Sequence, residues 1–349
     1  MYLRQSRRLS RVAPYIAATV IGGAALAPQF AAAQSVEQFY KSNTLTITIG
    51  HPPGGSYDLY ARLAADHLKN HLPGSPTTIV QHRPGGGGVK AVAWFYAQAP
   101  RDGSNIGLFP ETIGQTQILQ PDIGRWKVQE MRYVGSFAPV NAVFMIRKDA
   151  PAKSPQEMLK TEIKVACTGR NSQSYQSPAA LKELGGFKFD LVCGYPGSAE
   201  ATLALLRGET DMLSSAWNSW RSGHRAEIES GAIRPVIQVG LVRNKELPNV
   251  PLMQELVDDP KVKQALEFVS AGAAIGRALI APPGVPQERL AALRAAFDKM
   301  VVDPAFLKDA EKRRAEIDPT PGAEVDKYAL RIVEAPQEAI QMASKAMSE

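Results

Sequence analysis

The sequence has little of what marks most enzymes and nucleic-acid-binding proteins. Its 349 residues include five histidines and two cysteines, and 7% of them are aromatic. It lacks the glycine–lysine loop of nucleotide-binding proteins, the Gly-x-Ser-x-Gly turn of esterases and the His-Glu-x-x-His helix of zinc proteases. It also lacks a Lys/Arg stripe with interleaved aromatics. We therefore expect no cofactor, no metal, no nucleic-acid partner and no enzymatic activity.

Long hydrophobic runs are lacking as well, except near the N-terminus. There, four arginines precede an Ala- and Gly-rich apolar run at 12–27, and three alanines follow at 31–33. This order is typical of a secretory signal peptide. A membrane anchor is the alternative, but the run is shorter than the ~20 apolar residues of a span. We expect residues 1–33 to be a cleaved leader and the protein to reach the periplasm. Without the leader arginines the formal charge falls from +6 to +2, so any preference for anions must be local.

The few cysteines and histidines do not form a recognisable site. Cys167 and Cys193 stand near the ends of two expected strands. Export permits a disulfide, but adjacent parallel strands rarely suit its geometry, so the unbonded state is favoured. His67 and His71 lie four apart on an expected helix without the Glu of a zinc motif. We expect both to be solvated at the surface.

Strand-like runs alternate with helix-like runs along most of the chain, which predicts an α/β class with parallel sheets. Expected strands are 45–49, 77–81, 105–109, 142–147, 163–167, 189–193, 211–214, 235–241 and 274–281. Only helices are expected after 281, too little for a third domain. The economical arrangement has lobe 1 at 34–141 and 275–349, and lobe 2 at 142–274. Two linkers, near 142–147 and 274–280, then form a hinge beside a cleft.

Four turns share one design, in which a strand ends, small residues follow and a helix begins. They are 52–56, 83–88, 168–172 and 195–198. In parallel sheets such turns lie at the carboxyl edge of the strands, where ligands bind. Glycines expose backbone N–H groups, and a helix N-terminus attracts anions. Two such turns in each lobe suit a ligand with carboxylates.

In this order, the turns resemble those of the tripartite tricarboxylate transporter substrate-binding proteins, the Bug receptors, over the mature length. The landmarks are Pro53–Asp58, Arg83–Gly88, Ala99–Gly103, Tyr195–Ser198, Leu247–Pro251 and Ala281–Pro286. The resemblance implies a type II periplasmic binding protein-like fold with two α/β lobes, a two-stranded hinge and an interlobe ligand cleft. It also implies a monomeric receptor that binds a mono- or dicarboxylate and delivers it to membrane permease subunits.

The resemblance also implies a set of ligand-binding positions. In lobe 1 they are Gly54, Gly55, Ser56, Gly87 and Gly88, and in lobe 2 Arg170, Asn171, Ser172, Ser174, Tyr195, Gly197 and Ser198. Four positions depart from the family pattern. His51 replaces an aromatic residue, Val89 replaces Asn, Pro196 replaces a frequent Lys, and Arg170 replaces a small polar residue. Arg170 is either a bidentate carboxylate clamp or a surface arginine.

Further residues near the turns have two interpretations each. Trp217 forms either an apolar wall of the ligand site or part of the core. Thr112, beside Glu111, is placed to meet a ligand hydroxyl or ammonium. Asp58 is expected to act as a first-turn partner of its helix rather than as a ligand contact, since it would repel a carboxylate.

Two other functions remain open from the sequence. The same fold can serve as a ligand sensor for a signalling partner, and neighbouring genes for a large and a small membrane subunit would favour transport instead. A periplasmic hydrolase would use His51 as the base and Ser56 as the nucleophile. That arrangement lacks a third member to orient the base.

Overall fold

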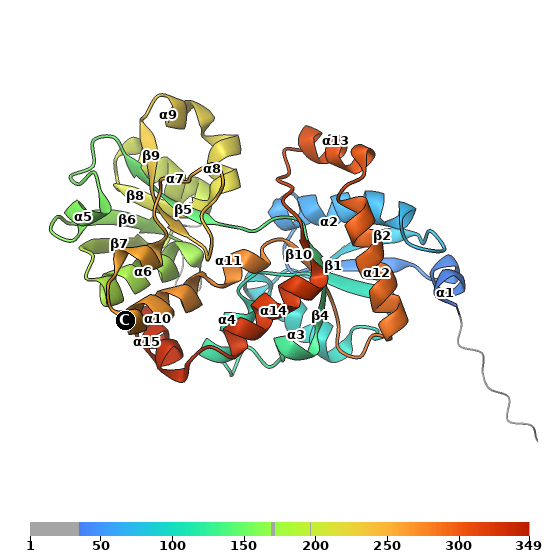
Figure 1. Cartoon of the computed structure of the whole chain (residues 1–349). Helices are drawn as coiled ribbons and strands as arrows, with labels where there is room; N and C mark the ends of the chain where they lie inside the picture. Colours follow the sequence, from blue (N-terminus) through green and yellow to red (C-terminus); the bar gives the residue numbers. More distant parts are fainter. Residues whose placement is uncertain (1–34, 169–171, 196, 349) are drawn as a thin grey trace, which may run out of the picture. The chain divides into compact units, whose positions relative to one another are not determined.

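The structure is a computed structural model that describes residues 35–168, 172–195 and 197–348. The expected leader, 1–33, lies outside the described residues. The described chain forms two β-sheets with helices packed on their faces (Figure 1). The expected α/β class is therefore confirmed. The sheets are not purely parallel as expected, because each one contains antiparallel as well as parallel strand pairs.

The first sheet has the strand order β11-β4-β10-β3-β1-β2. Its strands are β1 (Leu45–Ile49), β2 (Thr78–His82), β3 (Asn105–Leu108), β4 (Arg132–Ser136), β10 (Ala278–Ala281) and β11 (Thr320–Pro321). Strand β1 pairs in parallel with both β2 and β3, whereas β10 is antiparallel to β3 and β4. The apolar residues of β1 are fully buried, as expected for a strand covered on both faces. The carboxyl end of β1 is thus flanked by the carboxyl ends of two neighbours.

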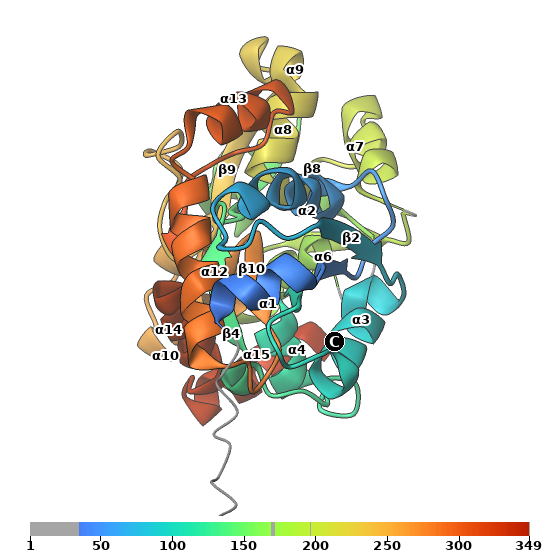
Figure 2. The same ribbon diagram turned by 90° about the vertical axis from the view of Figure 1, so that its right-hand side faces the viewer.

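Helices cover both faces of this sheet. They are α1 (Val36–Ser42), α2 (Ser56–His67), α3 (Val89–Gln98), α4 (Ile113–Leu119), α12 (Gln287–Met300), α13 (Pro304–Lys312) and α14 (Gly322–Val333), with short 3-10 turns η1 (Leu68–Asn70), η2 (Gly86–Gly88) and η3 (Val128–Glu130). Helices α2 and α12 pack on β1 and β4 respectively (Figures 1 and 2). They share one core, which contains Leu63 and Phe297. A second core, with Phe95 and Val325, lies under α3 and α14.

The second sheet has the order β7-β6-β8-β5-β9. Its strands are β5 (Ala142–Arg147), β6 (Ile163–Cys167), β7 (Phe189–Cys193), β8 (Met212–Ala216) and β9 (Ile233–Val239). Its helices are α5 (Pro155–Met158), α6 (Gln173–Gly185), α7 (Ser198–Arg207), α8 (Trp217–Gly223), α9 (Arg225–Glu229), η4 (Met253–Leu256) and α10 (Pro260–Ser270). The short helix α11 (Gly272–Ile275), which follows α10, packs instead on α14 and α4 of the first sheet. Strand β5 is buried on both faces, because Phe144 lies in the core under α6 and α10 while Val143 lies in the core under α7 and α8. Strand β6 is parallel to both β7 and β8, which repeats the arrangement around β1.

The last helix departs from the expected division of the chain. Helix α15 (Gln337–Ser348) packs against α10 and α6, on the second sheet (Figure 1), although 275–349 was assigned to lobe 1. Its buried face consists of small residues, Ala339, Ala343 and Ala346. Small side chains let two helices approach closely, and the half-buried Ile340 and Met347 add apolar contacts to the core that Phe268 of α10 also joins. Composition alone did not indicate which sheet would receive it.

Two segments that connect the sheets are hydrogen-bonded to each other. The Val140 N–H donates to Ala273 O at 2.9 Å, and the Arg277 N–H donates to Ala138 O at 3.0 Å. The Phe137 N–H in turn donates to Arg277 O at 2.9 Å. The first of these segments, 137–141, precedes β5, so the crossing lies earlier than the expected 142–147. Paired linkers of this kind are where hinge motion is absorbed.

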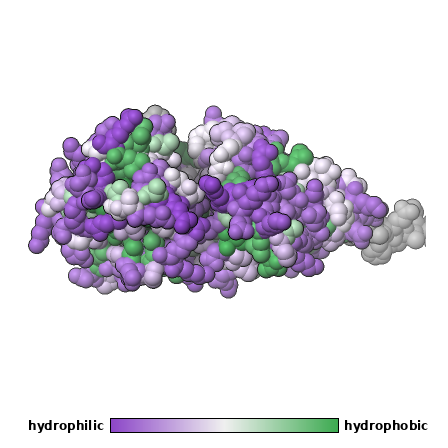
Figure 3. All heavy atoms as spheres, turned by 90° about the horizontal axis from the view of Figure 1, so that it is seen from above, coloured by the Kyte–Doolittle hydropathy of each residue, from purple (hydrophilic) through white to green (hydrophobic). Residues whose placement is uncertain are grey.

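Within the described ranges, none of the helices combines the length and apolar character needed to cross a bilayer. On the face shown in Figure 3, hydrophilic residues predominate and hydrophobic ones are scattered.

Gly276 provides a test of the linker geometry. Its φ of 60° and ψ of −137° suit only glycine, and a Cβ there would lie 1.9 Å from Ala138 O. Gly276→Ala is expected to lower the free energy of unfolding by about 3 kcal/mol in urea denaturation, through strain and overpacking. Gly223→Ala is the control, because a Cβ there meets no atom within 4 Å. Equal losses in the two variants would contradict the role of Gly276.

Candidate functional site

Three turns meet at the carboxyl edge of the first sheet. Ile49 at the end of β1 is in register with His82 of β2 and with Leu108 of β3, so the turns that follow all leave the same edge. The first two are in direct contact, since a Cβ on Gly50 would lie 2.5 Å from the Cα of Gly88. A helix and a strand lie between these turns in the sequence, and the parallel pairing of β1 with β2 brings the turns together in space.

The first turn ends at the N-terminus of α2. Gly54 and Gly55 are exposed, and a Cβ on either would meet no atom within 4 Å. The Gly54 N–H donates to Asp58 Oδ2 at 2.9 Å. The expectation that Gly54 offers this N–H to a ligand is therefore corrected, because the acidic residue of the first helical turn reaches back and takes it. Ser56 is the first residue of the helix.

Asp58 is confirmed as a partner of its own helix. It is 5% exposed and accepts from Gly54 N–H and from Arg62 Nε at 2.9 Å, while His82 Nε2 lies 2.7 Å from its Oδ1. Burial by itself would raise the pKa of Asp58, but the hydrogen bonds from Arg62, Gly54 and His82 lower it to about 2. The carboxylate is thus ionised and fully occupied within the turn.

The second turn requires glycine at each of its four glycine positions. Gly85, Gly86, Gly87 and Gly88 all have positive φ, at 142°, 59°, 66° and 97°, where other residues are strained. Gly87 faces open space, whereas Gly88 is buried against Pro110 and His51. Val89 is half-buried as the first residue of α3. Of this turn, Gly87 is the residue most open to a ligand.

A buried polar cluster lies beneath these turns. The Arg277 guanidinium donates to Ser56 Oγ at 3.0 Å and to Glu111 Oε2 at 2.7 Å. The Tyr57 hydroxyl also donates to Glu111, at 2.9 Å, and the His51 ring stacks on the Tyr57 ring with centroids 4.1 Å apart. Sequence reasoning missed Arg277 and Tyr57. For Arg277 no local signal existed, because 166 residues separate it from Glu111.

Thr112 also lies at this edge. It is half-buried at the N-terminus of α4 (N-cap position) and follows Glu111 directly. The third turn, after β3, therefore brings Thr112 near the first two, as the sequence predicted for a residue after an adjacent parallel strand.

His51 and Ser56 are not arranged as a base and a nucleophile. Ser56 Oγ accepts from Arg277, and among the described residues the buried His51 Nδ1 has no hydrogen-bond partner. The ring of His51 fills the aromatic position against Tyr57. Burial first, and then the nearby Arg277 charge, lower the pKa of His51, so the imidazole is neutral at pH 7.

The second sheet presents hydroxyl groups at its own carboxyl edge. Ser174 Oγ lies 2.8 Å from Ser172 Oγ and 3.2 Å from Thr168 Oγ1, and it accepts from the Thr168 N–H at 3.2 Å. Gly197 is the residue before α7, and Ser198 is its exposed first residue. Tyr195 is half-buried beside them. These predicted residues thus share one edge.

Two predicted residues of that edge, Arg170 and Asn171, lie outside the described residues. The clamp assigned to Arg170 stays a prediction. Sequence reasoning missed Gln173, in the first turn of α6, whose Nε2 donates to Ser177 Oγ at 3.1 Å and Ser214 Oγ at 3.0 Å. Gln173 joins the helix to the end of β8 and thereby positions this edge.

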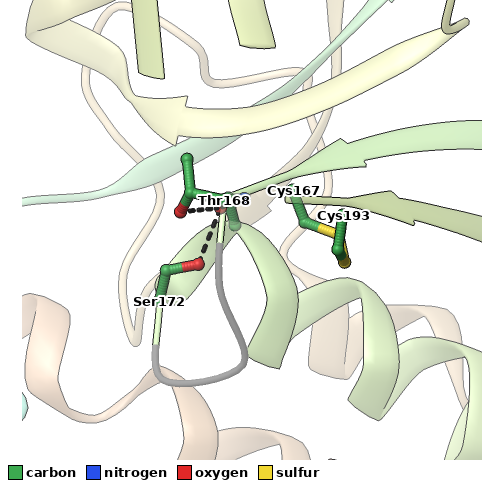
Figure 4. The surroundings of a disulfide bond; sticks show 5 residues. Cys167, Thr168, Ser172 and Cys193 are labelled. Carbon is green, nitrogen blue, oxygen red and sulfur yellow. Dashed lines mark hydrogen bonds between the residues drawn. A yellow bond between two sulfur atoms is a disulfide. The ribbon is translucent and has the colours of Figure 1, made fainter. Parts of the chain in front are cut away.

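The expectation of unbonded cysteines is wrong. Cys167 and Cys193 form a disulfide, with their Cα atoms 4.4 Å apart. They are direct register partners at the last positions of β6 and β7, and strand ends are free to adjust where strand interiors are not. Figure 4 shows the bond beside Thr168 and Ser172. The disulfide therefore ties together the strands from which both predicted ligand-binding turns of this sheet leave.

Trp217 belongs to the core and not to a ligand wall. It is 7% exposed and packs in the core under α7 and α8. Its Nε1–H donates to Glu246 Oε2 at 2.6 Å. Of the two interpretations that the sequence allowed, core packing is the correct one, and the polar edge of the indole is also satisfied.

The two histidines expected at the surface are instead paired. His67 Nε2 lies 3.0 Å from Asp309 Oδ2, and His71 Nε2 lies 2.9 Å from Asp303 Oδ2. Their side chains are 14% and 18% exposed, so they hold α13 on α2 and η1. In the described part of the chain no group of three or more potential metal ligands occurs.

A cavity of about 1220 Å³ lies away from these turns. The paired linkers line it through Pro139 and Ala274, and charged residues such as Arg221, Arg314 and Glu316 complete it. None of the predicted ligand residues that the structure describes is among its lining residues. Its size alone does not make it the ligand site, because the glycine turns and the N-termini of α2 and α3 lie elsewhere.

The comparisons with known proteins agree with this geometry. A family model described as the tripartite tricarboxylate transporter family receptor, TctC, matches residues 60–333. A Cupriavidus necator protein designated "UPF0065 protein in gbd 5'region" is 26% identical over 320 residues, which cover 88% of each chain.

Two solved structures show the same fold. A TctC solute-binding protein from Polaromonas, without ligand, has a TM-score of 0.69 at 20% identity and covers 88% of this chain and 99% of its own. MatC from Rhodopseudomonas palustris, with bound malate, has a TM-score of 0.60 at 22% identity, with 88% and 99% coverage. The expected two-lobed, type II periplasmic binding protein-like fold is confirmed.

The Asp58 network predicts a pH-dependent contribution to stability. Asp58→Asn is expected to lower the free energy of unfolding by about 2 kcal/mol at about pH 7. Because the folded pKa is about 2 and the unfolded one ~3.9, this contribution is complete above about pH 4 and is lost as the pH falls toward 2. Urea denaturation at about pH 7 and pH 3 measures it. Asp66→Asn, at a 53% exposed position of the same helix, is the control. If the difference in the free energy of unfolding between the wild type and Asp58→Asn were as large at about pH 3 as at about pH 7, the ionised Asp58 carboxylate would not be the source of this stability.

His51 should titrate below the ordinary histidine pKa. The neutral imidazole stabilises the fold above about pH 6.5, and this stability is lost as the pH falls. His51→Phe retains a ring against Tyr57 and removes the proton. The wild type is therefore expected to lose stability relative to this variant between about pH 7.5 and pH 5. The prediction would be refuted if the free energies of unfolding of the wild type and His51→Phe changed with pH in parallel. It would also be refuted if an NMR titration gave a His51 pKa at or above the ordinary histidine value.

Proposed function

Because the chain belongs to the tripartite tricarboxylate transporter receptor family, we propose that it captures a small mono- or dicarboxylate between the turns of its two lobes and delivers it to a membrane permease. Members of this family are periplasmic solute-binding receptors. The observation that carries the proposal is the contact between the Gly50–Gly55 and Gly85–Gly88 turns beside the N-terminus of α2.

The ligand contacts in the first lobe are assigned to Gly55, Ser56, Gly87 and Thr112, with His51, Gly54, Gly88 and Val89 forming the turns around them. Helices α2 and α3 begin at these turns, and each N-terminus stabilises an anion by ~0.3–1 kcal/mol. The hydroxyl of Ser56 adds a donor. A carboxylate is the ligand group that matches several N–H and O–H donors without a free cation.

We assign ligand specificity to the second lobe. Its contacts are Ser172, Ser174, Tyr195, Gly197 and Ser198, together with Arg170 and Asn171. Thr168, Ser172 and Ser174 supply hydroxyl groups, which suit a second carboxylate or a ligand hydroxyl. The Rhodopseudomonas palustris protein of the same fold holds malate, which carries both.

The energetics suffice for a receptor. Two or three charge-assisted hydrogen bonds contribute ~1.5–3 kcal/mol each. After the cost of association, these bonds and the helix N-termini reach the roughly −8 kcal/mol of a micromolar complex. A ligand that contacts both lobes binds the closed arrangement better than the open one. This difference in affinity drives closure about the paired linkers.

A thermal-shift screen of organic acids tests the proposal. At a concentration about 100-fold above Kd, a bound carboxylate stabilises the fold by ~2.7 kcal/mol, which raises Tm by about 5 °C. Malate is one acid of the panel, and the corresponding amides are the uncharged controls. Ser56→Ala is expected to reduce the shift.

The same samples are assayed for ester hydrolysis. A receptor leaves its ligand unchanged and shows no turnover that depends on Ser56. Hydrolysis of an ester, combined with no stabilisation by any carboxylate, would overturn the proposal.

A further inference from the structure

Arg277 is a buried arginine on a segment that links the two sheets. It is 7% exposed and stands between Gly276 and the first residue of β10. Its N–H and C=O both pair with the other linker, at Ala138 and Phe137. The backbone of Arg277 is therefore held by both connections between the lobes.

The side chain of Arg277 reaches into the first-lobe turns. Its Nε donates to Ser56 Oγ at 3.0 Å and its Nη1 to Glu111 Oε2 at 2.7 Å. The guanidinium also lies over the Tyr57 ring, 4.2 Å from the centroid. One residue thus joins the linker, the start of α2 and the turn after β3.

The chemistry of these bonds fixes the role of the Ser56 hydroxyl. A guanidinium has only donors, so Ser56 Oγ must accept from it. The Ser56 proton is then left to donate elsewhere. A ligand that meets Ser56 must offer an acceptor, and a carboxylate oxygen does so.

The positive charge of Arg277 is neutralised by the negative charge of Glu111. Glu111 is the acidic partner of Arg277, with side chains 16% and 9% exposed. Removing the negative charge would leave a buried cation near the ligand turns, and removing the positive charge would leave a buried anion there. The two changes should act on an anionic ligand with opposite signs.

We propose that Arg277 is a positioning residue for the carboxylate site, which makes Ser56 a donor to the ligand and ties that turn to the paired linkers. The inference rests on the proposed function for the identity of the ligand. It goes beyond that function in two ways. It assigns a positioning role to Arg277, which lies outside the ligand-binding turns, and it predicts whether removing each charge of the pair weakens or strengthens ligand binding.

The test compares Arg277→Met, Arg277→Lys and Glu111→Gln with the wild type. The matched control is Arg294→Met, because Arg294 makes a similar pair with Asp326 and a bond to Tyr133 O away from the turns. Affinity for malate is measured by calorimetry. In parallel, hydrogen exchange of the ligand-free proteins is followed at the amides of Leu59 and Phe137, which are bonded to Gly55 O and Arg277 O.

Arg277→Met is expected to weaken malate binding at least about tenfold, because the buried Glu111 is left unpaired. It should also speed exchange at Leu59 and Phe137 by at least about tenfold. Glu111→Gln retains an acceptor and is expected to bind malate at least as tightly as the wild type. Arg277→Lys is expected to bind malate more tightly than Arg277→Met, because it keeps the positive charge beside Glu111. It should bind more weakly than the wild type, because an ammonium cannot donate to Ser56 and Glu111 in the same forked geometry.

Equal losses of affinity in Arg277→Met and Glu111→Gln would overturn the proposal, as would unchanged exchange in Arg277→Met or equal exchange in Arg294→Met. If Arg277→Met does not fold, Arg277→Lys is still expected to weaken malate binding, because an ammonium cannot serve both Ser56 and Glu111, while Glu111→Gln is not; equal losses in these two variants would also overturn the proposal. If malate does not bind the wild type, the ligand assignment fails, while the exchange experiment still decides the positioning role of Arg277.

Discussion

Parallel pairing of β1 between β2 and β3 is the constraint on which the site depends. Because Ile49 is in register with His82 and Leu108, three turns from separate parts of the chain must leave one edge. Helices that begin there point their N-termini toward a common place, and the glycines allow backbones to touch. No charged side chain needs to reach the ligand for an anion to be favoured.

The second sheet repeats this arrangement around β6, with a different means of holding it. There the strand ends are joined covalently by Cys167 and Cys193, and hydroxyl groups replace glycine N–H groups as the nearest donors. The first lobe instead relies on a buried ion pair, Arg277 with Glu111. In the function that we propose, the first lobe holds the carboxylate and the second lobe contacts the rest of the ligand.

Features that depend on neighbouring residues in the chain were predicted from the sequence better than features that depend on distant ones. Most strands and the glycine turns were predicted, because periodicity and turn chemistry are local. The expectation was wrong at β4 and β11, which were missed, and at 274–277, since the expected strand 274–281 begins only at Ala278. Expected strands such as 45–49 and 163–167 match β1 and β6. The pairing of His67 with Asp309 and the packing of α15 were not predicted, because each depends on a partner distant in the chain. The core position of Trp217 was one of the two interpretations that the sequence allowed, and only the structure decided between them.

The sequence by itself determined the α/β class, the four turns and the family, since these are written in spacing and composition. Only the tertiary structure decided what each polar group does. It gives the Gly54 N–H to Asp58, bonds the cysteines and places Arg277 under Ser56. The physical reason is that hydrogen bonds and ion pairs act over a few ångströms, and the register of the sheets together with the packing of helices and linkers sets which residues come within that reach.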